Sequence, residues 1–180
     1  SLQETVVVSR TEETKSEMES LAHAIAGNPA LISNGVRTDY GYIGDVGALP
    51  PTIGALSVNP GSYATWRGPY LQDNLAASVG AASTDITQDA WGVTYAYSPA
   101  GATIASSGGG SAITRPIANS ADDLLVNQVS VSVTDLSGKS PGATYDDSIR
   151  ITLAFPNGIG GTTTKQLIPS SGGWAQYDSI

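Results

Sequence analysis

The 180-residue chain carries 8 Lys and Arg residues against 16 Asp and Glu residues, a formal net charge of −8. This acidic balance argues against nucleic-acid binding and against electrostatic docking on anionic lipids. The sequence has no cysteine, which excludes disulfides and cysteine-ligated metal sites. Hydrophobic residues make up 40% of the chain, enough for a core, and 21 glycines with 10 prolines favour turn-rich β structure over a helix bundle.

Residues 4–26 are predicted to form an amphipathic helix, because good helix formers dominate residues 12–26. Gly27-Asn28-Pro29 then supplies a stop signal. The polar face is acidic rather than basic, so we expect the helix to lie on a sheet and not on a membrane surface. The stripe expected to face that sheet consists of Met18, Leu21, Ala22 and Ile25.

A loop-rich region follows at residues 28–65. We expect a helical turn at residues 30–33, a short extended piece within residues 36–43 and a short helix at residues 52–56. These elements would connect the helix to the rest of the fold.

Two aromatic segments are the most distinctive feature of the sequence, Trp66-Arg67-Gly68-Pro69-Tyr70-Leu71 and the segment from Asp89 to Tyr97. Each joins large aromatic residues to a Gly or Pro that constrains the backbone. We expect a loop that enters a sheet, followed by its first strand at residues 92–98. Trp66 and Tyr70 are expected either to pack in the core or to form an exposed contact between subunits. Arg67 is expected either to pair with Asp89 or another acid, or to be solvated. The structural motif consists of Trp66, Arg67, Gly68, Pro69, Tyr70, Asp89, Trp91, Gly92, Tyr95 and Tyr97.

The next residues predict further strands of the same sheet. Residues 102–106 are expected to form a return strand, and residues 106–111 a flexible turn or hairpin tip. Residues 112–117 are expected to form an edge strand, because Pro116 cannot donate a ladder hydrogen bond. Residues 119–124 are expected to form a turn or the start of a short helix.

After Leu124 the pattern changes to short alternating strands separated by turns. Such a meander favours a small β-sandwich. Its last sheet edge would be a natural place for another chain to add. The expected strands are residues 129–134, 148–155, 162–168 and 174–177.

The aromatic segments resemble the head of type II secretion major pseudopilins and related type IV pilin-like proteins. A Trp-Arg-Gly-Pro-Tyr-Leu element, a spacer and an Asp-x-Trp-Gly-x-x-Tyr-x-Tyr-x-Pro element occur here in the order of that family, from Trp66 to Pro99. Asp39–Asp45 and Leu49-Pro50 sit where the family leads from its long helix into the head. The resemblance covers residues 1–105, and residues 125–180 differ from the usual short pseudopilin tail.

This resemblance implies a structural subunit of a type II secretion pseudopilus or a type IV pilus-like filament. It implies that an apolar helical segment, absent from this sequence, would precede Ser1, anchor the subunit in the inner membrane and later pack in the fibre core. The expected partners are other pilin-like subunits and the secretion or pilus assembly machinery. The expected location is the inner membrane with the head in the periplasm, or an extracellular filament.

Together these features predict an α+β fold. A pilin-like N-terminal helix packed on an antiparallel β-sheet would form one domain over residues 1–124. A small all-β, sandwich-like module would form the second over residues 125–180.

The residue types argue against an enzyme. His23 is the only histidine, it lies in the polar predicted helix, and no Gly-x-Ser-x-Gly segment accompanies it. One histidine without cysteine leaves few ligands for a catalytic zinc ion.

Calcium remains an open expectation. Many members of the family hold calcium in the loop after the Tyr-x-Tyr strand, and the corresponding region here contains Ser106, Ser107, Asp122 and Asp123. The spacing departs from the family pattern and the Asp-rich run is missing, so no cofactor is predicted, and calcium at Asp122 and Asp123 is kept as an alternative.

An alternative function is an extracellular adhesin or carbohydrate-binding module. In that hypothesis Trp66, Trp174 or Tyr177 would be exposed aromatic platforms beside polar loops. Exposure of these side chains separates the two hypotheses, because a buried aromatic ring offers no platform.

Overall fold

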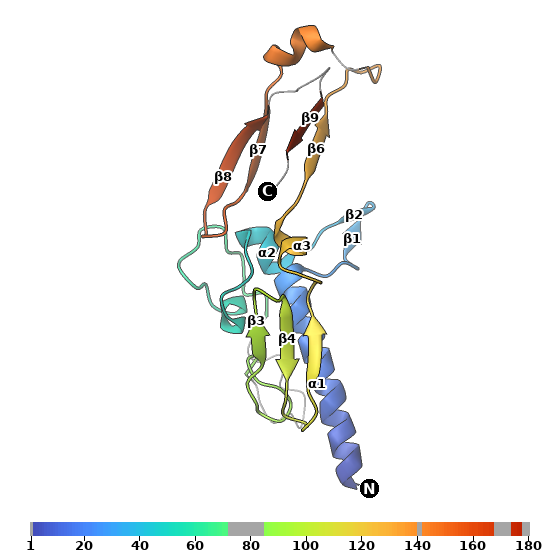
Figure 1. The fold of residues 1–180 in the computed structure, drawn as a ribbon, viewed down its shortest axis with the longest axis vertical. Coiled ribbons are helices and arrows are strands. Elements are labelled where there is room, and N and C mark those ends of the chain that lie inside the picture. Colours follow the sequence, from blue (N-terminus) through green and yellow to red (C-terminus); the bar gives the residue numbers. More distant parts are fainter. Residues whose placement is uncertain (1, 72–84, 140–141, 168–173, 178–180) are drawn as a thin grey trace.

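A computed structural model describes residues 2–71, 85–139, 142–167 and 174–177 and shows an α+β fold of one long helix, short helices and small antiparallel sheets. Figure 1 shows an elongated molecule. We call the described residues 14–125 the head and the described residues 126–177 the β module. This confirms the predicted α+β class with an N-terminal helix.

Helix α1 (Leu2–Ala26) provides the surface on which the head is built. Its C-terminal half buries the predicted stripe of Met18, Leu21, Ala22 and Ile25, together with Thr14 and Ala24. Residues 2–9 are all exposed, so the N-terminal end of α1 projects from the head (Figure 1). The helix and its buried face are therefore as the spacing predicted.

The chain after α1 forms a small hairpin of β1 (Ile32–Ser33) and β2 (Val36–Arg37). The helical turn expected at residues 30–33 is wrong, because Asn34 and Gly35, with φ of 51° and 77°, make a tight turn between two strands.

The short extended piece expected within residues 36–43 is β2, which ends at Arg37, and α2 (Gly41–Val46) begins within the same range. The carboxylate of Asp39 explains the change. It accepts hydrogen bonds from the backbone N–H groups of Asn28, at 2.7 Å, and Gly41, at 3.0 Å, and so joins the end of α1 to the start of α2. The short helix η1 (Ile53–Leu56) follows as predicted.

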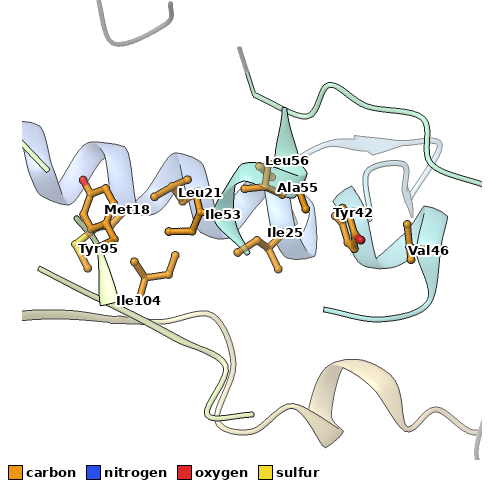
Figure 2. Close-up of a cluster of buried hydrophobic side chains, with 11 residues drawn as sticks. Met18, Leu21, Ile25, Tyr42, Val46, Ile53, Ala55, Leu56, Tyr95 and Ile104 are labelled. Atoms are coloured by element: carbon orange, nitrogen blue, oxygen red, sulfur yellow. The ribbon is translucent and has the colours of Figure 1, made fainter. Parts of the chain in front are cut away.

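The sheet of the head is antiparallel, in the order β3-β4-β5. It consists of β3 (Ala96–Ser98), β4 (Thr103–Ser106) and β5 (Ile113–Pro116). The strand that carries Pro116 is at the edge, as predicted. The first strand is shorter than the expected residues 92–98, because residues 89–93 form a closed loop before it. The core cluster joins α1 to α2, η1 and the sheet (Figure 2) and includes Met18, Leu21, Ile25, Tyr42, Val46, Ile53, Leu56, Tyr95 and Ile104.

The β module follows the short helix α3 (Asp122–Leu125). It contains β6 (Val129–Ser132), the short helix η2 (Ala143–Ser148), β7 (Ile151–Pro156), β8 (Thr162–Leu167) and β9 (Trp174–Tyr177). The described strands form two separate antiparallel pairs, β6 with β9 and β7 with β8. The valines of β6 and the large apolar residues of β7 are half-buried, and Gly160 is the one buried residue among those whose burial is described in the module.

Three five-residue loops share one hydrogen-bonding pattern: Asp89–Val93, Asp135–Lys139 and Asn157–Gly161. In each, the first backbone N–H donates to the fifth carbonyl, at 2.8, 2.8 and 3.0 Å. The Oδ1 atom of the first residue accepts from the third and fifth N–H groups. A glycine at the fourth position has φ between 78° and 85°. The loop therefore needs Asp or Asn first and glycine fourth.

The third of these loops attaches the β module to the head. Gly158 donates its N–H to the carbonyl of Val46 at 2.8 Å. The Gly160 carbonyl accepts from the N–H groups of Ala64 and Thr65, at 3.0 and 3.3 Å. The ring of Tyr63 packs directly on Gly160. The turn between β7 and β8 is thus part of the head, although its strands belong to the module.

We predict that Gly160→Ala destabilises the protein much more than Gly138→Ala. Both glycines hold the fourth position of the same loop with nearly equal φ, but a Cβ on Gly160 would overlap Tyr63, whereas Gly138 has open space. Gly138→Ala should cost about 1 kcal/mol for the left-handed backbone alone, and Gly160→Ala about 3 kcal/mol. Urea unfolding measures both, and equal losses would contradict the packing of this turn on the head.

Candidate functional site

The Trp66–Tyr70 loop closes over the head through aromatic and polar contacts. The indole N–H of Trp66 donates to the Ala55 carbonyl at 3.1 Å, and the Trp66 and Tyr70 rings meet edge to face at 5.7 Å. The Tyr70 hydroxyl donates to Oδ2 of Asp45 at 2.7 Å. Burial and then this carboxylate raise the pKa of Tyr70 above its ordinary value. The Gly68-Pro69 bond is cis, and the Gly68 backbone lies against the Trp66 ring.

Arg67 lies on the outside of this loop. Its side chain is 83% exposed, and its Nε is 3.8 Å from Oδ1 of Asp45. The expected pairing with an acid is therefore made with Asp45 and not with Asp89. Such an exposed pair contributes little to stability, so Arg67 remains available at the surface.

Asp89, the one carboxylate of the motif, is buried, with 1% of its surface exposed. Oδ1 accepts from the N–H groups of Trp91 and Val93, at 3.0 and 2.9 Å. Oδ2 accepts from the Ser106 hydroxyl at 2.6 Å and the Gly108 N–H at 3.1 Å. Burial opposes ionisation, but these hydrogen bonds outweigh it, and the pKa of Asp89 is lowered.

The glycine-rich residues 106–111, expected to be a flexible turn or hairpin tip, form the tip between β4 and β5 and pack on the aromatic segment. A Cβ on Gly108 would meet the carboxylate of Asp89, and a Cβ on Gly109 would meet the indole ring of Trp91 at 2.9 Å. The glycines are needed for this close approach. Gly92 has φ of 79° and occupies the fourth position of the Asp89 loop.

Polar contacts also join α1 to the sheet. The Tyr95 hydroxyl donates to Oε2 of Glu17 at 2.8 Å, and the amide of Ala90 donates to the buried Thr14 hydroxyl at 3.2 Å. Burial raises the pKa of Glu17, although the Tyr95 hydrogen bond partly offsets it. These contacts place Tyr95 on α1, while Tyr97 packs beside the core with a buried hydroxyl that has no hydrogen-bond partner in the described residues.

The acidic face of α1 holds one further link to the edge strand. Arg115 donates to Oε2 of Glu19 at 2.6 Å, and Oε1 of Glu19 lies 3.0 Å from Nε2 of His23. The hydrogen bond from Arg115 lowers the pKa of Glu19. His23, the single histidine, is thus a half-buried partner of a helix glutamate.

Both aromatic segments contact the same core cluster, but their carboxylates act separately. Asp45 serves the first segment and Asp89 the second. Asp45 was not among the motif residues, since its place one helical turn after Tyr42 gave no sign of a tyrosine partner more than twenty residues away. The signal that sequence reasoning lacked is the fold-back of residues 66–70 over α2.

The calcium expectation finds no assembled ligand set in the described residues. Asp122 and Asp123 begin α3 with both side chains exposed. Across the ranges that the structure describes, no three His, Cys, Asp or Glu side chains come close enough to hold a metal ion.

The aromatic platforms of the alternative hypothesis are restricted by these contacts. Trp66 is half-buried with its N–H bonded, and it packs against Tyr70 rather than standing free. The side chains of Trp174 and Tyr177 lie outside those described.

Two exposed apolar surfaces stand out. On the projecting end of α1, Leu2 and Val8 are 84% and 62% exposed, and Val6 and Val7 are nearly half exposed. On the β1–β2 hairpin, Leu31, Ile32 and Val36 are at least half exposed. Within the described part of the chain, no helix combines the length and the apolar character needed to span a bilayer.

A groove of about 390 Å³ lies where the head meets the β module. Its walls include Arg37, Tyr40 and Leu124 from the head and Phe155 from the β module. The Arg37 guanidinium lies over the Tyr40 ring at 5.1 Å and donates to the Ala26 carbonyl, so it closes the end of α1. The groove therefore has a mainly apolar lining, to which Asp123 and Asn127 add polar groups, and the side chain of its one arginine already makes structural contacts.

The chain matches no protein-family model, no curated protein and no solved structure in the three comparisons. The functional argument accordingly rests on the residues and contacts described above.

We predict that Asp89→Asn destabilises the protein by about 2–3 kcal/mol, because the amide would face the N–H of Gly108 with a donor and leave buried groups unpaired. Asp135→Asn is the matched control, since Asp135 makes the same loop contacts while exposed. Its loss should be clearly smaller. Chemical unfolding at neutral pH compares the two, and equal losses would contradict the buried role of Asp89.

The lowered pKa of Asp89 also predicts a pH dependence. A carboxylate with a depressed pKa in the folded state stabilises the fold fully above its unfolded-state pKa of about 4. This contribution is lost as the pH falls through the lower folded-state pKa. The stability difference between the wild type and Asp89→Asn should therefore be constant near neutrality and shrink in acid, as measured by urea unfolding across pH. A difference that widens in acid would show that the sign is wrong.

Proposed function

We propose that the chain is a structural subunit of a type II secretion pseudopilus or a type IV pilus-like filament, as the resemblance of its aromatic segments implies. The observation that carries the proposal is the division of α1. One half is embedded in a packed head, and the other half projects with exposed valines. A helix held at one end by a folded head is suited to packing its free end among copies of itself.

The energetics of the projecting helix support this proposal. Isolated helices as short as the projecting residues 2–9 are marginally stable in water, and most helix stability in proteins comes from packing of one face. Residues 2–9 have no such packing, yet they expose Leu2, Val6, Val7 and Val8. Burial of this end against neighbouring helices would supply the missing stabilisation, at roughly 25 cal/mol per Å² of apolar surface.

The head provides what a subunit of a filament requires, a rigid body fixed to its helix. The core cluster, the Tyr95–Glu17 hydrogen bond and the Arg115–Glu19 pair all join α1 to the sheet. A contact between different surfaces of neighbouring copies extends without closing, which produces a filament. The proposed partners are further pilin-like subunits and the secretion or pilus assembly machinery.

The proposed location follows from the same resemblance. A preceding apolar segment would hold the subunit in the inner membrane with the head in the periplasm, and assembly would carry the head into the filament. The chemistry proposed for the head is recognition between subunits, without a catalytic step.

The decisive experiment is immunogold electron microscopy of the source cells with an antibody raised against the head. Labelling along filaments is expected. The gene should also encode a short basic leader, a glycine and an apolar helix upstream of Ser1. Antibody that labels no filament, together with an upstream sequence of another kind, would overturn the proposal.

A variant pair tests the role of the projecting helix. Val7→Asp should abolish incorporation into filaments, because it places a charge on the surface expected to pack, while the melting temperature of the 180-residue chain should stay unchanged since Val7 is exposed. Leu136→Asp, which changes a fully exposed leucine in a loop of the β module, is the control and should incorporate normally. Normal incorporation of Val7→Asp would contradict this role for α1.

A further inference from the structure

The sequence contains two Asn-Gly dipeptides, Asn34-Gly35 and Asn157-Gly158, and the structure gives them opposite surroundings. Asn-Gly is the dipeptide in which a backbone amide most easily reaches the preceding side chain, because glycine has no Cβ to obstruct it. Reaction requires a free amide nitrogen and a side chain able to turn towards it. The contacts at each site decide whether these conditions are met.

Asn34-Gly35 meets both conditions. The two residues form the exposed tip of the β1–β2 hairpin, and the space beside Gly35 is open. Neither the Asn34 side chain nor the Gly35 N–H makes a hydrogen bond to any described residue. The hairpin has only two residues in each strand, and a two-stranded hairpin of this kind opens readily.

Asn157-Gly158 meets neither condition. Oδ1 of Asn157 accepts from the N–H groups of Ile159 and Gly161, at 3.1 and 2.9 Å, which holds the side chain in its loop. The Gly158 amide donates to the Val46 carbonyl at 2.8 Å, so its nitrogen is occupied. The same turn is held on the head through Gly160 and cannot open without separating the module from the head.

We infer that Asn34 is a site of spontaneous deamidation and isoaspartate formation in the folded protein, and that Asn157 is protected by its contacts. The Gly35 nitrogen loses its proton and attacks Cγ of Asn34. A C–N bond forms, the bond from Cγ to Nδ2 breaks, and ammonia leaves, which gives a cyclic succinimide. Water then opens the ring at either carbonyl and gives aspartate or isoaspartate.

The product changes the hairpin in two ways. Each conversion adds one negative charge beside the exposed Leu31, Ile32 and Val36. The isoaspartate product also lengthens the main chain by one carbon at a two-residue turn, which the paired register of Ser33 with Val36 cannot accommodate unchanged. The modification therefore converts an apolar arm of the head into a charged and less ordered one.

The test is peptide mapping by mass spectrometry after incubation of the folded chain at mildly alkaline pH, below its melting temperature. Trypsin places Asn34 in the fragment 16–37 and Asn157 in the fragment 151–165. Conversion at Asn34 should be at least about tenfold faster than at Asn157, because local opening of the hairpin is far more frequent than release of the docked turn. Fragmentation spectra distinguish Asn34 from Asn28 in the first peptide.

A parallel incubation in denaturant is the matched control, since both dipeptides then lack structure and should convert at similar rates. Gly160→Ala offers a second control, because it loosens the docked turn and should speed conversion at Asn157 without changing Asn34. Equal rates in the folded protein, or no conversion at Asn34, would overturn the inference. A difference between the sites that persists in denaturant would also overturn it, because the contacts would then not be its cause.

Discussion

The buried face of α1 is the constraint on which the rest of the structure depends. Met18, Leu21 and Ile25 form one side of the core, and α2, η1 and the three-stranded sheet each contribute the other side. No sheet of three short strands buries both its faces by itself, so the helix supplies the apolar layer that the strands need. Loss of this face would remove the common partner of α2, η1 and the sheet.

Polar contacts then give the packed elements their positions. Thr14, Glu17 and Glu19 extend from α1 to the Asp89 loop, to Tyr95 and to Arg115 respectively. These three residues follow one another along α1, so their contacts fix the position of the sheet along the helix axis. Apolar packing alone is not directional and leaves this choice open. Asp89 completes the arrangement by tying its own loop to the end of β4 through Ser106.

Periodic features of this chain were readable from sequence. The spacing of Met18, Leu21 and Ile25 gave the helix and its buried face, and the position of Pro116 gave the edge strand. These depend on repeat distances within one element. The helical turn expected at residues 30–33 was wrong because a two-residue turn at Asn34-Gly35 outweighs local helix propensity. The short extended piece expected within residues 36–43 ends at Arg37 because Asp39 bonds backbone groups on both sides of it. The partner of Tyr70 could not be found, since Asp45 meets it only after the chain folds back. Contacts between residues far apart in the sequence produce no periodic pattern from which they could be predicted.

The turn at Asn157–Gly161 has a mechanical consequence. The β module leaves the head once through residues 126–128, and it returns to the head at this turn, where Val46 of α2 and the backbone of residues 64 and 65 receive it. A body joined to another by a single strand can swing about that strand, whereas two separated attachments restrict both swing and twist. A force applied to the far end of the module is therefore transmitted through this turn to α2. Since α2 packs on α1, the force then reaches the long helix.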